Sequence, residues 1–191
     1  MPFPGCLILV VGPSGAGKDS LMSGAQAQLP RNGRFRFVRR YITRPAEAGG
    51  EDHIPIAPDV FQKLVDERFF CLHWQAHDLL YGIPVTINDE ILDGRTVIAN
   101  VSRSVLDTAR TNFPYVRIIN VTAPPDILAA RLHGRGRESL SDVTKRLGRS
   151  VQVAGNDVFE VVNDGSIEDG IRKFTTLINA FTEGGTPAAA Q

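Results

Sequence analysis

The sequence is poor in cysteine, has no surplus of charge of either sign, and contains no long apolar run. Its two cysteines, Cys6 and Cys71, are too few for a disulfide framework, so we expect free thiols and a reducing, cytoplasmic compartment. The 21 basic and 21 acidic residues balance, which argues against nucleic acid or a membrane surface as a partner. No stretch approaches the roughly 20 apolar residues of a membrane span. The oligomeric state stays open.

Apolar segments typical of buried strands alternate with segments of helical periodicity. The first, residues 6–11, is uninterrupted, as expected for a central parallel strand covered on both faces. This alternation predicts an α/β fold with a central parallel sheet and right-handed crossovers. Prolines and adjacent glycines interrupt it between residues 43 and 88, where we expect a small subdomain for the substrate.

Local signals also predict single elements. They are a strand at 35–42, a helix at 60–67 capped by Asp59, a turn at Tyr81-Gly82, and a capping box of Ser166 and Asp169 before the last amphipathic helix. The chain is expected to form one domain over 1–183, with an acceptor subdomain at about 35–90, a lid at about 134–142 and a disordered tail at 184–191.

A glycine-rich loop ending in a lysine directly follows the first predicted strand and opens a helix. Its backbone N–H groups and the helix N-terminus would point at an anion, and Lys18 supplies a point charge for the β- and γ-phosphates. The alternative is an ordinary turn, but residue types, spacing and flanking elements together favour a phosphate loop and thus the three-layer P-loop NTPase fold. The nucleotide-binding candidates are Gly12, Pro13, Ser14, Gly15, Ala16, Gly17, Lys18, Asp19 and Ser20.

One position departs from the usual loop. Where a Ser or Thr hydroxyl ordinarily ligates Mg²⁺, this chain has Asp19. A carboxylate facing a triphosphate is repelled unless a divalent ion lies between them, so Asp19 is a candidate Mg²⁺ ligand, directly or through water. The alternative is that Asp19 only favours the helix start, where negative charge is stabilising. Both interpretations stay open.

An arginine-rich segment begins at Arg131, and Gly134 and Gly136 loosen it between two predicted helices. Phosphoryl transfer needs cations around the moving group and exclusion of water, which a hinged, arginine-bearing lid supplies. Arginine also binds phosphate through two parallel hydrogen bonds. The alternative is a solvated, charged helix face. Arg131 is a further nucleotide-binding candidate.

These motifs resemble the guanylate kinase family. The matching residues span nearly the whole chain: Gly12–Lys18, Tyr41-Ile-Thr-Arg44-Pro45, Tyr81-Gly82, Arg131-Leu132, Arg135-Gly136, Arg146-Leu147 and Val161-Val-Asn163-Asp164. The resemblance implies that Arg44 and Tyr81 hold the acceptor phosphate and that Asn163 lies near the adenine of ATP. It also implies that Arg135 and Arg146 bridge the phosphates and act in catalysis with Lys18.

The acceptor side departs from guanylate kinases. The run after Arg44 lacks their second phosphate-binding arginine, and their base-reading glutamate falls near Leu72 or His73, neither of which is a carboxylate. A site without that carboxylate leaves the N–H donors of guanine unpaired, at a cost of about 1–3 kcal/mol each. These departures argue against a guanine nucleotide as the acceptor.

At these positions the sequence resembles a sister family, the ribose 1,5-bisphosphate phosphokinases. They are Gly17-Lys-Asp19-Ser20, Ala48-Gly-Gly-Glu51-Asp-His53, His73-Trp74-Gln-Ala-His77 and Asn100-Val-Ser102-Arg103. This resemblance implies transfer of phosphate from ATP, with Mg²⁺, to ribose 1,5-bisphosphate in phosphonate breakdown, forming 5-phospho-α-D-ribose 1-diphosphate. The substrate-binding candidates are Arg44, His53, Trp74, His77, Tyr81, Asn100, Ser102 and Arg103, with Arg103 in place of the missing arginine.

Simpler interpretations stay open for several of these residues. Trp74 and the histidines beside it are also explained by packing, and Arg103 by a surface helix start. Two other functions stay open as well: a guanylate or other nucleoside monophosphate kinase, and a non-catalytic guanylate-kinase-like module that binds phosphoproteins. The intact loop glycines and Lys18 argue against the second.

Overall fold

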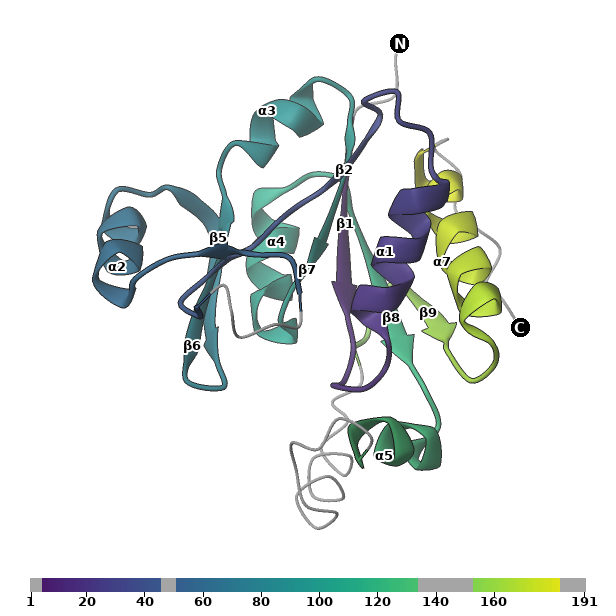
Figure 1. Cartoon of the computed structure of the whole chain (residues 1–191). Helices are drawn as coiled ribbons and strands as arrows, with labels where there is room; N and C mark the ends of the chain where they lie inside the picture. The colour runs from purple at the N-terminus through teal and green to yellow at the C-terminus, as the bar shows by residue number, and fades with distance from the viewer. Residues whose placement is uncertain (1–4, 46–50, 134–152, 183–191) are drawn as a thin grey trace. The chain divides into compact units, whose positions relative to one another are not determined.

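The computed structural model describes residues 5–45, 51–133 and 153–182 (Figure 1). A central parallel sheet has the strand order β2-β7-β1-β8-β9. Its strands are β1 (Cys6–Val11), β2 (Phe35–Phe37), β7 (Thr96–Asn100), β8 (Val116–Thr122) and β9 (Val158–Val162). A second sheet has the order β4-β3-β6-β5 and is built from β3 (Tyr41–Ile42), β4 (Ile54–Pro55), β5 (Phe70–Ala76) and β6 (Leu79–Pro84). The predicted α/β fold is confirmed.

Helices follow most strands of the central sheet: α1 (Lys18–Gln28), the 3₁₀ turn η2 (Arg103–Val105) with α4 (Leu106–Asn112), α5 (Pro125–His133) and α7 (Ile167–Thr182). Two more, α2 (Pro58–Asp66) and α3 (Ile87–Leu92), follow the strands β4 and β6 of the second sheet. Within the described ranges, no helix has the length and apolar character needed to cross a membrane.

The described residues fall into two compact units. The hairpin unit takes in the chain up to Leu9 and from Pro30 to Val116, and the loop unit takes in Val10–Leu29 and the chain from Arg117 onward. The expected lid (134–142) and tail (184–191) lie outside the described residues. The expected boundaries of one domain with an acceptor subdomain therefore stay predictions.

The loop unit is held together by α1 and α7, which lie side by side (Figure 1). Gly24 allows this close approach, because a Cβ atom there would lie 2.2 Å from Cδ1 of Ile171. The capping box at the start of α7 is confirmed, since the Asp169 backbone N–H donates to Ser166 Oγ at 3.1 Å. The hydrogen bond from the Ser166 hydroxyl, aided by Arg172, holds the pKa of Asp169 below its usual value.

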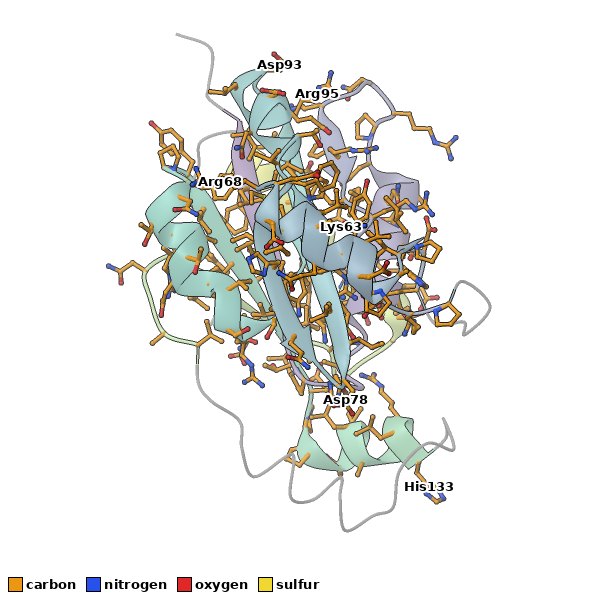
Figure 2. The ribbon with its side chains drawn as sticks, turned by 90° about the vertical axis from the view of Figure 1, so that its left-hand side faces the viewer. Lys63, Arg68, Asp78, Asp93, Arg95 and His133 are labelled. Carbon is orange, nitrogen blue, oxygen red and sulfur yellow. The ribbon has the colours of Figure 1, made fainter. Side chains whose placement is uncertain are left out.

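The centre of the second sheet is the antiparallel hairpin of β5 and β6. Its two-residue turn consists of His77 and Asp78, with φ of 51° and 58°, and Figure 2 shows Asp78 at the hairpin tip. The expected turn at Tyr81-Gly82 is therefore wrong, because both residues lie inside β6. Gly82 is needed there for close packing instead: a Cβ atom would lie 2.5 Å from the Phe70 ring.

Two further local predictions were wrong in detail. The expected strand at 35–42 is two strands, because β2 pairs with β7 in one sheet and β3 pairs with β6 in the other. The helix expected at 60–67 begins at Pro58, with Ala57 as N-cap. Proline suits the first helical position because a backbone N–H there would have no partner within the helix. Asp59 therefore lies in the first turn and is not the cap.

Both cysteines are free thiols, as expected, and burial raises the pKa of Cys71 to about 11.

Candidate active site

The loop after β1 has a backbone path that only glycine fits at its turning points. Gly12, Gly15 and Gly17 have φ of 145°, 85° and 91°. A Cβ atom on Gly12 would lie 2.0 Å from the carbonyl oxygen of Val121. Lys18 folds back across the loop and donates from Nζ to the carbonyl oxygens of Gly12 and Pro13, at 2.7 and 3.1 Å. This strand, loop and helix have the architecture that cradles phosphates in P-loop enzymes.

Asn163, which directly follows β9, supports this loop. Its buried side chain donates from Nδ2 to the carbonyl oxygen of Ala16 at 2.8 Å. A Cβ atom on Gly17 would lie 2.5 Å from the same nitrogen, so side chain and loop are in direct contact. Arg131 in turn donates to the backbone oxygen of Asn163 at 3.1 Å. The two residues therefore connect α5 and β9 to the loop, and their expected contacts with nucleotide stay predictions.

Asp19 lies in the first turn of α1, and Ser20 follows it. The N-cap of this helix is Gly17, without a side-chain capping bond. Among the described residues, no group of three or more His, Cys, Asp or Glu side chains could hold a metal by itself. A divalent ion at Asp19 would therefore need phosphate oxygens as its other ligands, which is the usual way in which proteins bind Mg²⁺.

In the hairpin unit, Arg44 carries donors that lack acceptors. Its Nε and Nη2 are buried and have no hydrogen-bond partner among the described residues. Glu51 faces it, but Arg44 Nη2 and Glu51 Oε1 are 3.6 Å apart, which makes an ion pair too long for a hydrogen bond. The other carboxylate oxygen, Oε2, accepts from Nε of Arg40 at 3.0 Å and from its Nη2.

Tyr81 and Trp74 form an aromatic pair next to these charges. Their rings stack with centroids 5.3 Å apart, and the guanidinium carbon of Arg40 lies 5.2 Å from the centroid of Tyr81. Burial, with a smaller contribution from Glu51, raises the pKa of Tyr81 above its ordinary 10.0, against the opposing charges of Arg40 and Arg44. The hydroxyl thus stays protonated near neutral pH and can donate to an oxyanion.

The ring of His53 links the backbone at Glu51 to the backbone at Arg44. The buried ring places Nδ1 2.9 Å from the carbonyl oxygen of Glu51 and Nε2 3.1 Å from that of Arg44. The structure thus gives both ring nitrogens backbone partners, and an additional contact with substrate stays a prediction.

The other acceptor candidates lie elsewhere in the hairpin unit. Asn100 ends β7, Ser102 Oγ accepts from the backbone N–H of Ser104 at 3.3 Å, and Arg103 begins η2, which packs against β5. His77 is exposed in the hairpin turn. Arg135 and Arg146 lie outside the described residues.

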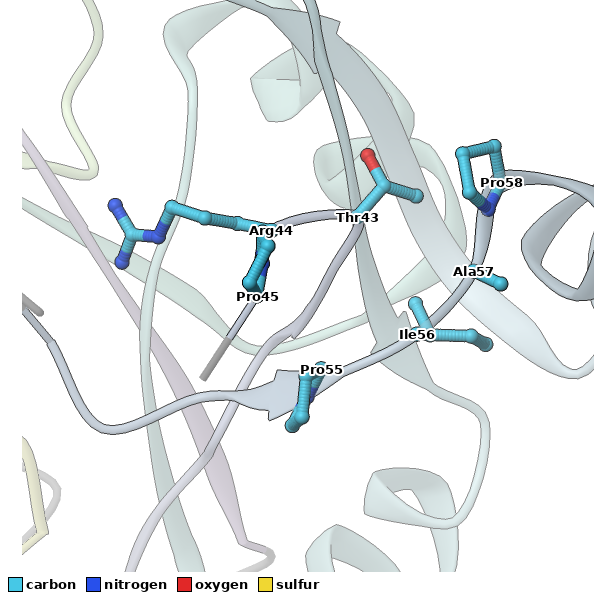
Figure 3. Close-up of a pocket in the computed structure, with 7 residues that line it drawn as sticks. All are labelled: Thr43, Arg44, Pro45, Pro55, Ile56, Ala57 and Pro58. Atoms are coloured by element: carbon cyan, nitrogen blue, oxygen red, sulfur yellow. The ribbon is translucent and has the colours of Figure 1, made fainter. Parts of the chain in front are cut away.

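A pocket borders Arg44, but its character is apolar. It is lined by Thr43, Arg44, Pro45, Pro55, Ile56, Ala57 and Pro58. In Figure 3 the Arg44 side chain points away from the three prolines. The charged partner of the guanidinium is Glu51, which does not line this pocket.

The comparison with known proteins decides the family. The guanylate kinase family model matches residues 5–181. The chain belongs to the guanylate kinase family. Membership implies a kinase that takes ATP as co-substrate and, typically, a divalent metal.

Several curated relatives show which members of the guanylate kinase family this chain resembles. It is 49% identical to ribose 1,5-bisphosphate phosphokinase PhnN of Agrobacterium fabrum, over 85% of this chain and 90% of the relative. It is 47% identical to the protein of the same name from Ruegeria, over 94% of each chain. A bifunctional ribose 1,5-bisphosphokinase-thymidine phosphorylase of Azorhizobium caulinodans is 43% identical over 93% of this chain, which spans only 26% of that relative. The predicted resemblance to ribose 1,5-bisphosphate phosphokinases is confirmed.

Solved structures confirm the fold. A guanylate kinase from Anaplasma phagocytophilum superposes with a TM-score of 0.68 at 16% identity, over 93% of this chain and 86% of that one. A sugar kinase from Janibacter superposes with a TM-score of 0.54 at 17% identity, over 96% and 99% of the chains. The three-layer P-loop architecture is thus shared across distant sequences.

Sequence reasoning missed Arg40 and a role for Glu51. The available signal was the pair Arg39-Arg40, which directly precedes β3, the strand that Arg44 follows. Nothing local, however, shows that a carboxylate eleven positions further on lies between Arg40 and Arg44. Such a cluster of partly buried charges becomes visible only once the two segments are folded together.

We expect Asn163→Ala to weaken the binding of ATP and GTP by the same factor, about tenfold, because the lost hydrogen bond supports the loop and reads no base. Isothermal titration calorimetry with both nucleotides measures this. Asn112→Ala, at an exposed asparagine of α4, should leave both affinities unchanged. A loss confined to ATP would instead place the side chain at the adenine.

Proposed function

We propose that this chain transfers the γ-phosphoryl group of ATP to ribose 1,5-bisphosphate, forming 5-phospho-α-D-ribose 1-diphosphate and ADP in phosphonate breakdown. The observation that carries the proposal is the charge pattern of the hairpin unit. Arg44 has buried donors without acceptors among the described residues, whereas Glu51 is taken up by Arg40. Such a site suits a phosphate, and its carboxylate among the described residues, Glu51, is already paired.

The expected position of the base-reading glutamate supports the same conclusion. Leu72 is fully buried in β5, and its neighbour His73 is exposed. Neither side chain can accept hydrogen bonds from guanine as a carboxylate does. A polar site that leaves the donors of a ligand unpaired rejects it by several orders of magnitude in the strongest cases. A nucleoside monophosphate is therefore the less favoured acceptor.

The chemistry asks little of the protein beyond positioning. The nucleophile is an oxygen of the C1 phosphate, which is already ionised near neutral pH, so no general base is required. This oxygen forms a bond to the γ-phosphorus as the bond from that phosphorus to the β–γ bridging oxygen breaks, and ADP leaves. Lys18 neutralises charge on the triphosphate, and Arg44 and Tyr81 orient the acceptor. Arg135 and Arg146 are proposed to neutralise the transferred group.

Mg²⁺ is proposed as the metal that shields the triphosphate. Asp19 would hold it together with phosphate oxygens, directly or through water. The remaining proposed substrate contacts are His53, Trp74, His77, Asn100, Ser102 and Arg103.

The acceptor is tested by coupled detection of ADP release. We expect kcat/KM for ribose 1,5-bisphosphate to exceed that for GMP by at least about 100-fold, because guanine finds no carboxylate partner. Lys18→Ala should abolish turnover of both acceptors. Faster turnover of GMP would overturn the proposal in favour of a nucleoside monophosphate kinase.

The metal ligand is tested by the Mg²⁺ dependence of Asp19→Ala. We expect activity to fall at least about tenfold at low Mg²⁺ and to recover partly with excess Mg²⁺, because the loss concerns metal affinity. Ser23→Ala, an exposed position of the same helix, is the control. An Asp19→Ala enzyme with an unchanged Mg²⁺ dependence would show that the acid only favours the helix start.

A further inference from the structure

A carboxylate lies within the cluster that we assign to the acceptor phosphate. The side chain of Glu51 is only 18% exposed, and it lies between those of Arg40 and Arg44, which are 11% and 20% exposed. In such a partly desolvated place, an unneutralised carboxylate would repel a phosphate and attract any nearby guanidinium. The partner of Glu51 thus decides whether the cluster can bind an anion.

The two arginines share Glu51 unequally. Arg40 donates to Oε2 from Nε, at 3.0 Å, and from Nη2, so its fork is taken up by the carboxylate. Arg44 approaches only Oε1, at 3.6 Å, and its Nε and Nη2 keep no hydrogen-bond acceptor among the described residues. Arg40 therefore satisfies the carboxylate, and Arg44 retains donors for another anion.

Aromatic rings hold Arg40 in this orientation. Its guanidinium carbon lies 5.2 Å from the ring centroid of Tyr81 and 6.0 Å from that of Trp74. The rings stack on each other almost in parallel, with 3° between their planes. A cation against such faces is attracted by the ring quadrupole and loses side-chain freedom. Arg40 is thus fixed on one side by aromatic faces and on the other by Glu51.

We propose that Arg40 is a positioning residue that neutralises Glu51 and thereby keeps Arg44 available to the phosphate of the acceptor. Without Arg40, Glu51 would pair fully with Arg44 and would repel the incoming phosphate. The identity of the acceptor rests on the proposed function, whereas the presence of a phosphate subsite at Arg44 does not. Arg40 does not replace the phosphate-binding arginine that is missing after Arg44, because its own donors are taken up by Glu51.

The test measures binding of ribose 5-phosphate by calorimetry and by the fluorescence of Trp74, the single tryptophan. We expect Arg40→Gln to weaken binding at least about tenfold, because the freed carboxylate captures Arg44. Removing that carboxylate in Arg40→Gln/Glu51→Gln should restore the affinity to within about threefold of the parent protein, and Glu51→Gln alone should also stay within about threefold.

An adjacent residue provides a matched control. Arg39 and Asp52 form a second pair at 2.8 Å, but their side chains are 53% and 76% exposed. Asp52→Asn removes the same charge as Glu51→Gln one position away and should leave the affinity unchanged, because exposed pairs are screened by water. Arg39 is kept, since it also donates to the backbone oxygen of His53 at 3.0 Å.

Three results would overturn the proposal. The first is that the parent protein does not bind ribose 5-phosphate, and the second is that Arg40→Gln binds it unchanged. The third is that the double variant binds as weakly as Arg40→Gln alone, because Arg40 would then be a direct ligand or a purely structural residue. Thermal unfolding checks each variant. If Arg40→Gln does not fold, Arg40→Lys replaces it: because an ammonium group cannot reproduce the guanidinium fork or its stacking on the rings, the affinity should fall. Adding Glu51→Gln to Arg40→Lys should then restore the affinity to within about threefold of the parent protein, and a double variant as weak as Arg40→Lys would contradict the proposal.

The outcome also separates this inference from the proposed function. The expected binding pattern with ribose 5-phosphate, combined with no turnover of ribose 1,5-bisphosphate, would contradict the proposed reaction and leave the role of Arg40 standing. Turnover of ribose 1,5-bisphosphate with kinetics that Arg40→Gln does not alter would support the proposed reaction and contradict the role of Arg40.

Discussion

A hydrogen bond between the Asn163 side chain and the carbonyl oxygen of Ala16 ties the end of β9 to the phosphate loop near the start of the chain. The glycines give the loop much conformational freedom, so this bond from a distant segment adds to those that Lys18 makes within the loop. Losing a buried bond of this kind costs about 1–3 kcal/mol. The contact works together with the packing of α7 on α1, so the second half of the chain fixes the loop that the first half supplies.

The hairpin unit keeps a partly buried guanidinium group, that of Arg44, available to bind an anion. Two guanidinium groups and one carboxylate leave a net positive charge there, and the aromatic pair of Tyr81 and Trp74 provides a flat surface beside it. His53 adds rigidity through the backbone. An anion binds such a preorganised set of donors at a lower entropic cost than it would a set of mobile side chains.

Patterns local in sequence predicted the fold class, the phosphate loop and the capping box of Ser166, because each depends on neighbouring residues. Tyr81-Gly82 has the local pattern of a turn, but the hairpin turn lies at His77-Asp78, and Gly82 instead makes room for the ring of Phe70. Tertiary partners explain the other differences. Neither the contact of Asn163 with Ala16 nor the shared carboxylate of Glu51 follows from spacing along the chain, because both join segments that only folding brings together.

The phosphate loop is shared by many kinases, so the acceptor side must determine which substrate this chain uses. Family membership implies ATP as the phosphate donor. On the acceptor side, Leu72 and His73 offer no carboxylate to a guanine base, which favours a phosphorylated sugar over a guanine nucleotide. The most direct test is mass spectrometry of the products formed from ATP and ribose 1,5-bisphosphate. The account predicts 5-phospho-α-D-ribose 1-diphosphate in amounts equal to the ADP released. ADP accompanied only by free phosphate, with ribose 1,5-bisphosphate unchanged, would contradict it.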